Sequence, residues 1–237
     1  MLLGARYPHV SLLRHAVMGG IGAGLVYLVW KLNGTWSPDM RLWKAFGGAA
    51  FFLLWFAVFI GPVSRLWKGL VRFVPWRREA GIWVAVLGLV HGYLVLDGWV
   101  RWSAWSLLGY AYIPELETYL RSEPGFGLAN LMGLLALLFI VILAATSFDK
   151  AVAFLGIGSW KWLHGFAYVA FYVIALHVVY FAFIHFTPSP ERVLMGLPTN
   201  YPPNPLRFYY LAAILSVFLA QASAFAATVR RERGFRK

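Results

Sequence analysis

The chain has 237 residues, of which 61% are hydrophobic and 13% are charged. An average soluble domain is about 45–50% apolar and about 25% charged, so this composition predicts a multi-pass membrane protein. A net charge of +12 would suit nucleic acid in a soluble protein. Here the basic residues lie in loops and tails, where they set topology and favour anionic membrane lipid, so we expect lipid and no nucleic acid as a partner. The absence of cysteine excludes disulfides, thiolate-ligated metal centres and the thioether attachment of c-type haem.

Six apolar segments are long enough to cross a bilayer as helices, because about 17–25 residues suffice. We therefore predict an all-α integral membrane fold, a six-transmembrane-helix bundle that forms a single domain over residues 1–237. The predicted helices span about residues 16–32, 43–63, 79–97, 127–146, 161–186 and 207–229.

The Lys and Arg residues are shared unevenly between the two sides of this bundle. The side that holds both termini and the connection 64–78 collects 14 of the 21. Cytoplasmic loops of membrane proteins carry the excess of Lys and Arg, so we expect both termini in the cytoplasm.

The longest connection, 98–126, contains tryptophans at every third position: Trp99, Trp102 and Trp105. This spacing places them roughly on one face of a short helix, and tryptophan prefers the membrane interface. We predict an interfacial helix on the outer side. The last connection contains six prolines between Thr187 and Leu206 and is predicted to be irregular.

Two histidines are expected at similar depths within the bundle. His91 is 12 residues into the third predicted helix and His177 is 16 residues into the fifth. At 1.5 Å per residue both lie about 18–24 Å from the cytoplasmic side. Facing histidines in an apolar bundle suit a b-type haem with two histidine ligands, whereas zinc would require a third or fourth ligand. The alternative is that each imidazole only forms a hydrogen bond with a neighbouring helix.

A third histidine, His164, precedes His177 by 13 residues, or about 20 Å of helical rise. That rise suits a second, inner haem, but an ideal helix leaves the two side chains about 220° apart, so a shared face would require a bulge or local unwinding. In place of a partner histidine, Arg78 and Arg77 stand 13 and 14 residues before His91, and they could pair with haem propionates. An inner haem would then take His15 or water as its second ligand, or stay five-coordinate. His185, at the outer helix end, is expected at the interface and not as a ligand.

These residues resemble a known family. The stretch RREAGIWVAVLGLVH, from Arg77 to His91, is similar to the third helix of ferric-reductase-like transmembrane proteins. It is especially similar to the haem-binding membrane subunits of protein-methionine-sulfoxide reductase systems. The stretch TSFDKAVAFLGIGSWKWLH, from Thr146 to His164, followed by His177, fits the same pattern, as does GPVSRLWK at 61–68. The resemblance covers about residues 30–186.

The resemblance implies a cytochrome b of the ferric-reductase-like type in a bacterial inner membrane. His91 and His177 would bind the iron of an outer haem b, and His164 that of a second, inner haem. Such proteins pass electrons from a cytoplasmic flavin reductase, through FMN, or from quinol to an acceptor on the outer face. In the sulfoxide reductase systems the acceptor is a periplasmic molybdopterin oxidoreductase.

Two other functions remain open at this stage. The chain could be an accessory or structural subunit that keeps the fold inside a larger membrane complex. It could also be a transmembrane metalloreductase whose outer haem reduces its substrate directly. Whether the chain is an enzyme is left open by the sequence, which favours an electron-transfer subunit of an oxidoreductase system over a complete enzyme.

Overall fold

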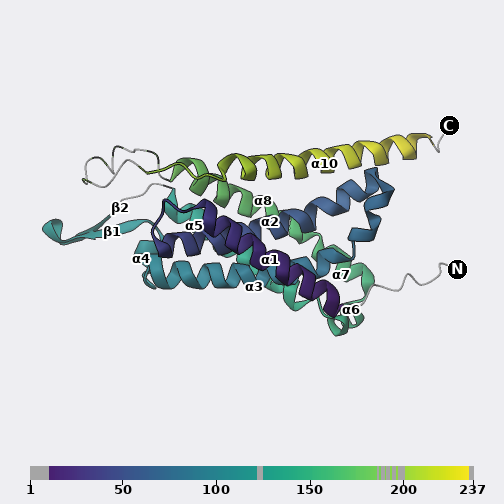
Figure 1. The fold of residues 1–237 in the computed structure, drawn as a ribbon, viewed down its shortest axis with the longest axis horizontal. Helices are drawn as coiled ribbons and strands as arrows, with labels where there is room; N and C mark the ends of the chain where they lie inside the picture. Colours follow the sequence, from purple (N-terminus) through teal and green to yellow (C-terminus); the bar gives the residue numbers. More distant parts are fainter. Residues whose placement is uncertain are drawn as a thin grey trace.

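A computed structural model describes residues 11–121, 125–185 and 201–234, together with the single positions 187, 190, 193 and 196. Within this part, six helices are long and apolar enough to cross a membrane, which confirms the predicted all-α six-helix bundle (Figure 1). Four spans are single helices: α1 (Leu12–Leu32), α2 (Pro38–Leu66), α5 (Phe126–Ala145) and α10 (Arg207–Gly234). The other two are interrupted or irregular. The predicted proline-rich connection lies largely outside the described residues.

The two composite spans carry the candidate histidines. The first is α3 (Trp76–Leu94), which continues as a π-helix at Val95–Trp99. The second consists of α7 (Ile157–His164) and α8 (Phe166–Val179), separated at Gly165 and followed by a π-helix at Tyr180–Ile184. Each histidine-bearing helix therefore widens one turn beyond its histidine, and such π segments are frequent at functional sites.

The bundle has two distinct ends (Figure 1). The start of α1 and the end of α10 lie at one end, which we call the terminal end. A short β-hairpin lies at the opposite end, which we call the hairpin end. Helices α2 and α5 run from the hairpin end to the terminal end, and α3 and α8 run back. Between α5 and α7, the short helix α6 (Asp149–Leu155) lies at the terminal end.

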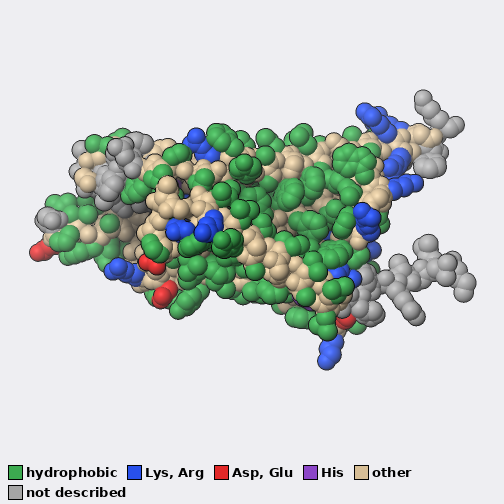
Figure 2. Space-filling model, viewed as in Figure 1, with side chains coloured by type: hydrophobic (Ala, Val, Ile, Leu, Met, Phe, Trp, Pro, Cys, Tyr) green, Lys and Arg blue, Asp and Glu red, His purple; other side chains and the backbone are tan. Residues whose placement is uncertain are grey.

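Helix α2 forms the centre of the bundle. Two thirds of its most apolar stretch is buried, whereas each of the other spans buries less than a third of its own. Phe51 of α2 packs against Phe171 of α8 and Tyr210 of α10, with ring centroids 5.9 and 5.1 Å apart. The outer spans instead expose apolar side chains, which cover most of the visible face (Figure 2). This inverted pattern is that of a bundle solvated by lipid.

The tryptophan-rich connection differs from its prediction. Trp99 ends the π-helix, Trp102 has a positive φ of 57°, and Trp105 lies in the four-residue helix α4 (Ala104–Leu107). The three side chains therefore do not share the face of one interfacial helix. The chain then forms an antiparallel hairpin, β1 (Tyr110–Ile113) and β2 (Thr118–Arg121), with Tyr110 paired to Arg121. Tryptophan at every third position would suggest a continuous helix, but the left-handed backbone at residues 101 and 102 interrupts it.

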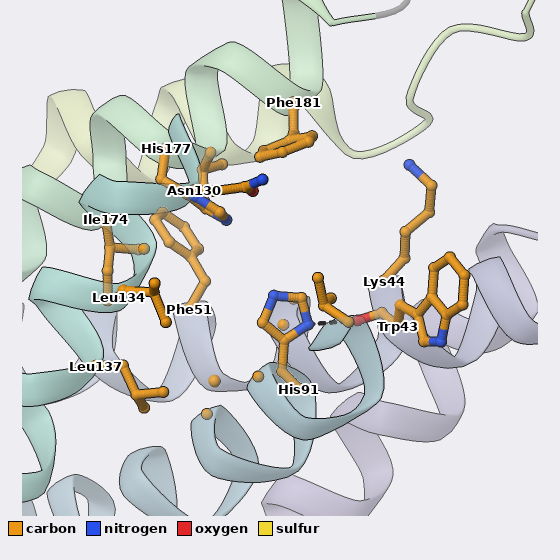
Figure 3. Close-up of a pocket in the computed structure, with 18 of the residues that line it drawn as sticks. Trp43, Lys44, Phe51, His91, Asn130, Leu134, Leu137, Ile174, His177 and Phe181 are labelled. Carbon is orange, nitrogen blue, oxygen red and sulfur yellow. Dashed lines mark hydrogen bonds between the residues drawn. The ribbon is translucent and has the colours of Figure 1, made fainter. Parts of the chain in front are cut away.

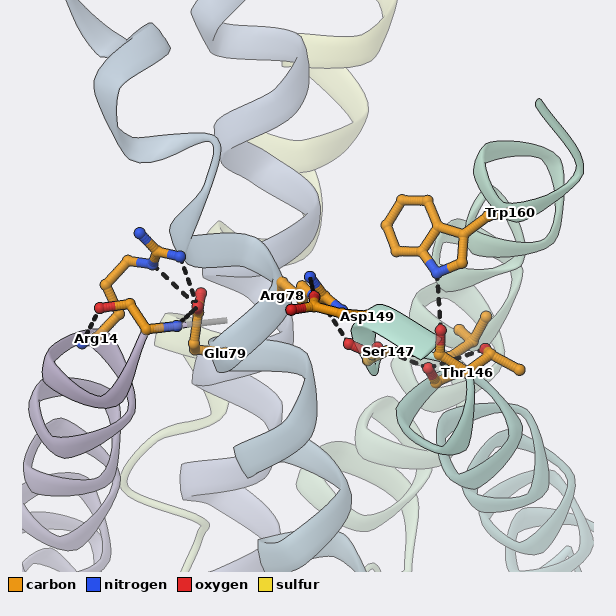
Figure 4. A network of polar contacts seen from close by, with 9 residues as sticks. Arg14, Arg78, Glu79, Thr146, Ser147, Asp149 and Trp160 are labelled. Carbon is orange, nitrogen blue, oxygen red and sulfur yellow. Dashed lines mark hydrogen bonds and ion pairs between the residues drawn. The ribbon is translucent and has the colours of Figure 1, made fainter. Parts of the chain in front are cut away.

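Two ion pairs fasten helices together at the terminal end (Figure 4). Glu79 of α3 is fully buried and lies 2.9 Å from the guanidinium of Arg14 of α1; it also accepts a hydrogen bond from the Ser11 backbone N–H. Arg78, also buried, lies 2.6 Å from Asp149 and donates to the Ser147 carbonyl. The first pair connects α3 to α1, and the second connects α3 to the start of α6.

The buried carboxylate of Glu79 gives a stability prediction. Glu79→Ala removes the acceptor for Arg14 and for the Ser11 N–H, so we expect a loss of about 3 kcal/mol of unfolding free energy. The measurement is chemical unfolding of the purified protein in detergent. Glu232→Ala, an exposed glutamate of α10, is the matched control and should change stability by less than about 0.5 kcal/mol. Equal stabilities of the two variants would contradict the prediction.

Candidate functional site

A cavity lies between α2, α3, α5 and α8, in the half of the bundle nearer the hairpin end (Figure 3). The volume that the centre of a water molecule can reach within it is about 200 Å³. One buried water needs only about 10–15 Å³ on the same measure, so the cavity is large enough for a bulky group. Its walls are mostly apolar, and His91 and His177 are among the residues that line it.

The structure brings these two histidines together from different helices. The ring centroids of His91 on α3 and His177 on α8 are 6.5 Å apart, and the ring planes are 82° apart. A bond between a metal and an imidazole nitrogen is about 2.0 Å, and a ring centre lies about 1.2 Å from its nitrogen. Two imidazoles on opposite sides of one metal ion therefore have centroids about 6.4 Å apart. The observed separation matches this value.

Both imidazoles are held in one orientation by a backbone carbonyl. Nδ1 of His91 lies 2.9 Å from the Trp43 carbonyl oxygen, and Nδ1 of His177 lies 2.8 Å from that of Ala129. A carbonyl only accepts, so Nδ1 carries the proton in each hydrogen bond. The lone pair of each neutral ring is then on Nε2, which leaves that nitrogen available to the cavity. Metal-binding histidines characteristically donate their other N–H to a carbonyl or carboxylate.

Two glycines allow the rings to approach the neighbouring helices. A Cβ atom at Gly47 of α2 would lie 2.9 Å from Cε1 of His91, and one at Gly133 of α5 would lie 2.9 Å from Nδ1 of His177. Each glycine lies four residues, about one helical turn, after the residue whose carbonyl accepts the histidine's hydrogen bond. Any larger side chain at either position would collide with the imidazole.

The donor set fits a group that takes two histidine nitrogens on opposite sides, as b-type haem does. Large apolar side chains suited to a porphyrin line the same cavity: Phe51, Leu134, Leu137 and Ile174 (Figure 3). A structural zinc site requires three or four protein ligands. Within the described part of the chain, His, Cys, Asp and Glu form no cluster of three or more that could hold a metal ion.

His164 lies outside this cavity, at the end of α7. Its ring stacks on Trp160, with centroids 3.8 Å apart, and its Nε2 lies 3.2 Å from Oγ1 of Thr146. The helix is interrupted between His164 and His177, at Gly165, where α7 ends and α8 begins. The structure thus joins His164 to the end of α5 and does not bring it to the pair. A role for His164 as an iron ligand stays a prediction.

The two arginines also lie at the terminal end, away from the histidine pair. Arg78 is held by Asp149 and Ser147, as described above. The guanidinium of Arg77 lies 6.0 Å from the ring centroid of Tyr168. On α3, Arg78 stands in place of a partner histidine, and its guanidinium is held by Asp149 and Ser147. A second, inner haem therefore stays a prediction.

His185 lies at the hairpin end of the bundle, where it is 95% buried in the protein. It packs among aromatic rings at the hairpin end, with Trp99 and Phe181 at centroid distances of 5.3 and 5.0 Å. Trp99 and Phe181 also line the cavity. This aromatic group therefore forms part of the cavity wall on the hairpin side, together with Leu107 and Asn204 of the outer connections.

Sequence reasoning missed the residues that orient the imidazoles. Trp43 and Ala129 act through their carbonyl oxygens, which any residue type supplies, so their identity gives no signal. The signal lies in the spacing. Counted from the residue whose carbonyl accepts the hydrogen bond, the glycine follows after four residues and the histidine after 48. This spacing occurs at positions 43, 47 and 91 and again at 129, 133 and 177. This repeat, at an offset of 86 residues, is visible in the sequence once the histidines are chosen.

The fold and the site together define a multi-pass membrane protein with a paired-histidine cavity in its apolar interior. The family model for the ferric reductase like transmembrane component matches residues 46–175, which is more than half of the chain. The chain belongs to this family, and it is therefore a membrane protein of the redox, electron-transfer type. The matched range contains His91 and His164 and ends two residues before His177. No curated protein and no solved structure matches the chain.

The glycine contacts give a second prediction. Gly47→Ala and Gly133→Ala should each push an imidazole away from its carbonyl, at a cost of about 1–3 kcal/mol, which corresponds to an affinity for haem that is weaker by about fivefold to 150-fold. The measurement is titration of the purified protein with haem b, the group that the donor set fits. Gly24→Ala is the control, because its new Cβ atom would meet nothing within 4 Å. Unchanged affinity in both cavity variants would show that the rings do not require this close approach.

Proposed function

We propose that this chain is a membrane b-type cytochrome that relays electrons across the bilayer. The observation that carries the proposal is the pair of carbonyl-anchored imidazoles, His91 and His177, whose ring separation of 6.5 Å is close to the value expected for two imidazoles on one metal ion. Bound haem b would supply a one-electron couple between ferric and ferrous iron. The chain's own contribution is to hold Nε2 of both histidines toward the cavity and to exclude water with apolar walls.

We further propose one haem in each chain, at the hairpin end. The support is the contrast between the two ends of α3. His91 faces a second histidine, whereas the level of His164 carries an arginine that pairs with Asp149. The polar contacts at the terminal end connect helices to one another, as those of a structural joint do.

The proposed direction of transfer is from the terminal end to the hairpin end. Lys and Arg side chains gather at the terminal end (Figure 2), which by the positive-inside rule favours the cytoplasm there. On this topology the donor is a cytoplasmic flavin reductase, through FMN, or quinol, and the membrane is a bacterial inner membrane. The acceptor we propose is a periplasmic oxidoreductase of the methionine-sulfoxide reductase type, for which the resemblance of residues 77–91 and 146–164 is the support.

The first test is the reduced-minus-oxidised visible spectrum of the purified protein, with haem quantified per chain. We expect one b-type haem, lost in His91→Ala and in His177→Ala and retained in His164→Ala. His185→Ala is the matched control, because it removes a buried imidazole that packs on aromatic rings outside the pair. A folded wild-type protein that binds no haem would contradict the proposal and favour a structural subunit. A second haem lost only in His164→Ala would contradict the single-haem proposal.

The ring geometry gives a spectroscopic prediction. The two imidazole planes are 82° apart. If both rings kept this angle while holding the iron of a bound haem, the two iron d orbitals that interact with them would be close in energy, and the ferric low-spin state would have a strongly anisotropic electron paramagnetic resonance spectrum. The measurement is the largest g value at low temperature. A moderately rhombic spectrum, as parallel imidazoles give, would show that the rings do not keep this orientation when haem is bound.

A further inference from the structure

One cationic side chain lines the cavity and has no role in the arrangement of the histidine pair described above. Lys44 of α2 follows Trp43, whose carbonyl holds His91, and it is the one Lys or Arg among the cavity-lining residues of the described chain. Its Nζ lies 4.5 Å from the centroid of the Trp36 ring, which precedes α2. Lysine side chains on a helix lean toward the helix N-terminus, so the ammonium group reaches toward the hairpin end. In Figure 3 the side chain extends along the side of the cavity.

The cavity is polar at one end and apolar at the other. Apart from the histidines and Tyr210, the polar residues that line it are Lys44, Asn130 and Asn204. Each of these three lies in or near the first turns of a helix that begins at the hairpin end. Val84 and Ile140, further toward the terminal end, are buried and apolar. A ligand that spans this cavity therefore meets a positive charge on one side and hydrocarbon on the other.

Haem b has the same division, because its two carboxylates lie on one edge and its apolar substituents on the others. A buried carboxylate is costly unless it is paired and hydrogen-bonded. We propose that Lys44 pairs with a carboxylate of the bound haem and so orients its carboxylate edge toward the hairpin end. This inference rests on the proposed haem function. It adds a positioning residue outside the histidine pair, at the end of the bundle opposite Arg77 and Arg78.

Lys44 would also influence the redox couple. A cation beside a haem carboxylate balances its negative charge, and unbalanced negative charge near the iron favours the ferric form. Replacing Lys44 by a neutral residue should therefore lower the midpoint potential. A purely structural lysine would change stability without affecting the preference for charged over esterified haem.

The test compares haem b with haem dimethyl ester, in which both carboxylates are neutral. Haem-free wild-type protein, Lys44→Met and Lys44→Arg are titrated with each ligand. A hydrogen bond to a charged group contributes about 1.5–3 kcal/mol, so we expect Lys44→Met to bind haem b about tenfold or more weakly than the wild type. Lys44→Met should bind the dimethyl ester with the wild-type affinity. Lys44→Arg should have the wild-type affinity for both ligands.

Lys31→Met is the matched control. Lys31 lies at the hairpin end of α1, also near aromatic rings, with its Nζ 5.6 Å from the Trp30 ring centroid, but it does not line the cavity. This variant should keep the wild-type ratio of the two affinities and the wild-type midpoint potential. If Lys44→Met does not fold, Lys44→Gln replaces it as the neutral variant.

The outcomes separate this inference from the proposed function. Loss of the preference for haem b in the neutral variant, with a lowered midpoint potential, supports the role of Lys44. An unchanged affinity ratio overturns it and leaves the histidine pair intact. A weaker affinity for both ligands alike also overturns it, because the lysine then acts through packing or on another anion. A wild-type protein that binds neither ligand overturns the proposed function itself.

Discussion

The site depends on two hydrogen bonds from imidazole to backbone. In each, a helical carbonyl accepts from Nδ1 of a histidine on the adjacent helix, at 2.9 Å for His91 and 2.8 Å for His177. This contact fixes the tautomer, the ring angle and the nitrogen that remains for a ligand. A histidine inside a membrane is costly without a partner, and here the carbonyl offsets that cost before any cofactor binds. The carbonyl thus accepts the hydrogen bond of the buried imidazole and leaves Nε2 oriented to bind a ligand. The two interpretations of these histidines, as hydrogen-bond donors and as metal ligands, therefore describe one arrangement.

The same arrangement occurs twice in the chain. Helix α2 supplies a carbonyl and, one turn later, a glycine to the histidine of α3, and α5 supplies both to the histidine of α8. The two helix pairs run in the same directions, and both histidine helices become π-helical within four residues of the histidine. Similar units with the same orientation, placed on opposite sides of a cavity, bring equivalent side chains to the same depth. Depth matching is therefore a consequence of the repeat and does not require a separate explanation for each histidine.

Helix count and histidine depth were predictable from the sequence because both depend on local properties, apolar length and rise per residue. Which histidines meet depends on helix pairing, and nothing in the segment 161–186 by itself shows that His177 faces a partner while His164 faces Trp160. The tryptophan spacing at 99, 102 and 105 failed because two residues with positive φ interrupt the helix. Gly47 was missed because a glycine that admits a ring looks the same in sequence as one that admits another helix.

Helix α3 carries ion pairs to neighbouring helices near its start and a histidine of the candidate site near its end. Near the terminal end, Arg78 and Glu79 are adjacent in sequence and point to opposite neighbours, one to the start of α6 and one to α1. These ion pairs fix the position of α3 from both sides at its first turn. The helix then rises through buried Val84 to His91, where a misplacement of about 1 Å would separate Nδ1 from the Trp43 carbonyl. Charges at the terminal end therefore contribute to the precision of the histidine pair although they do not contact it.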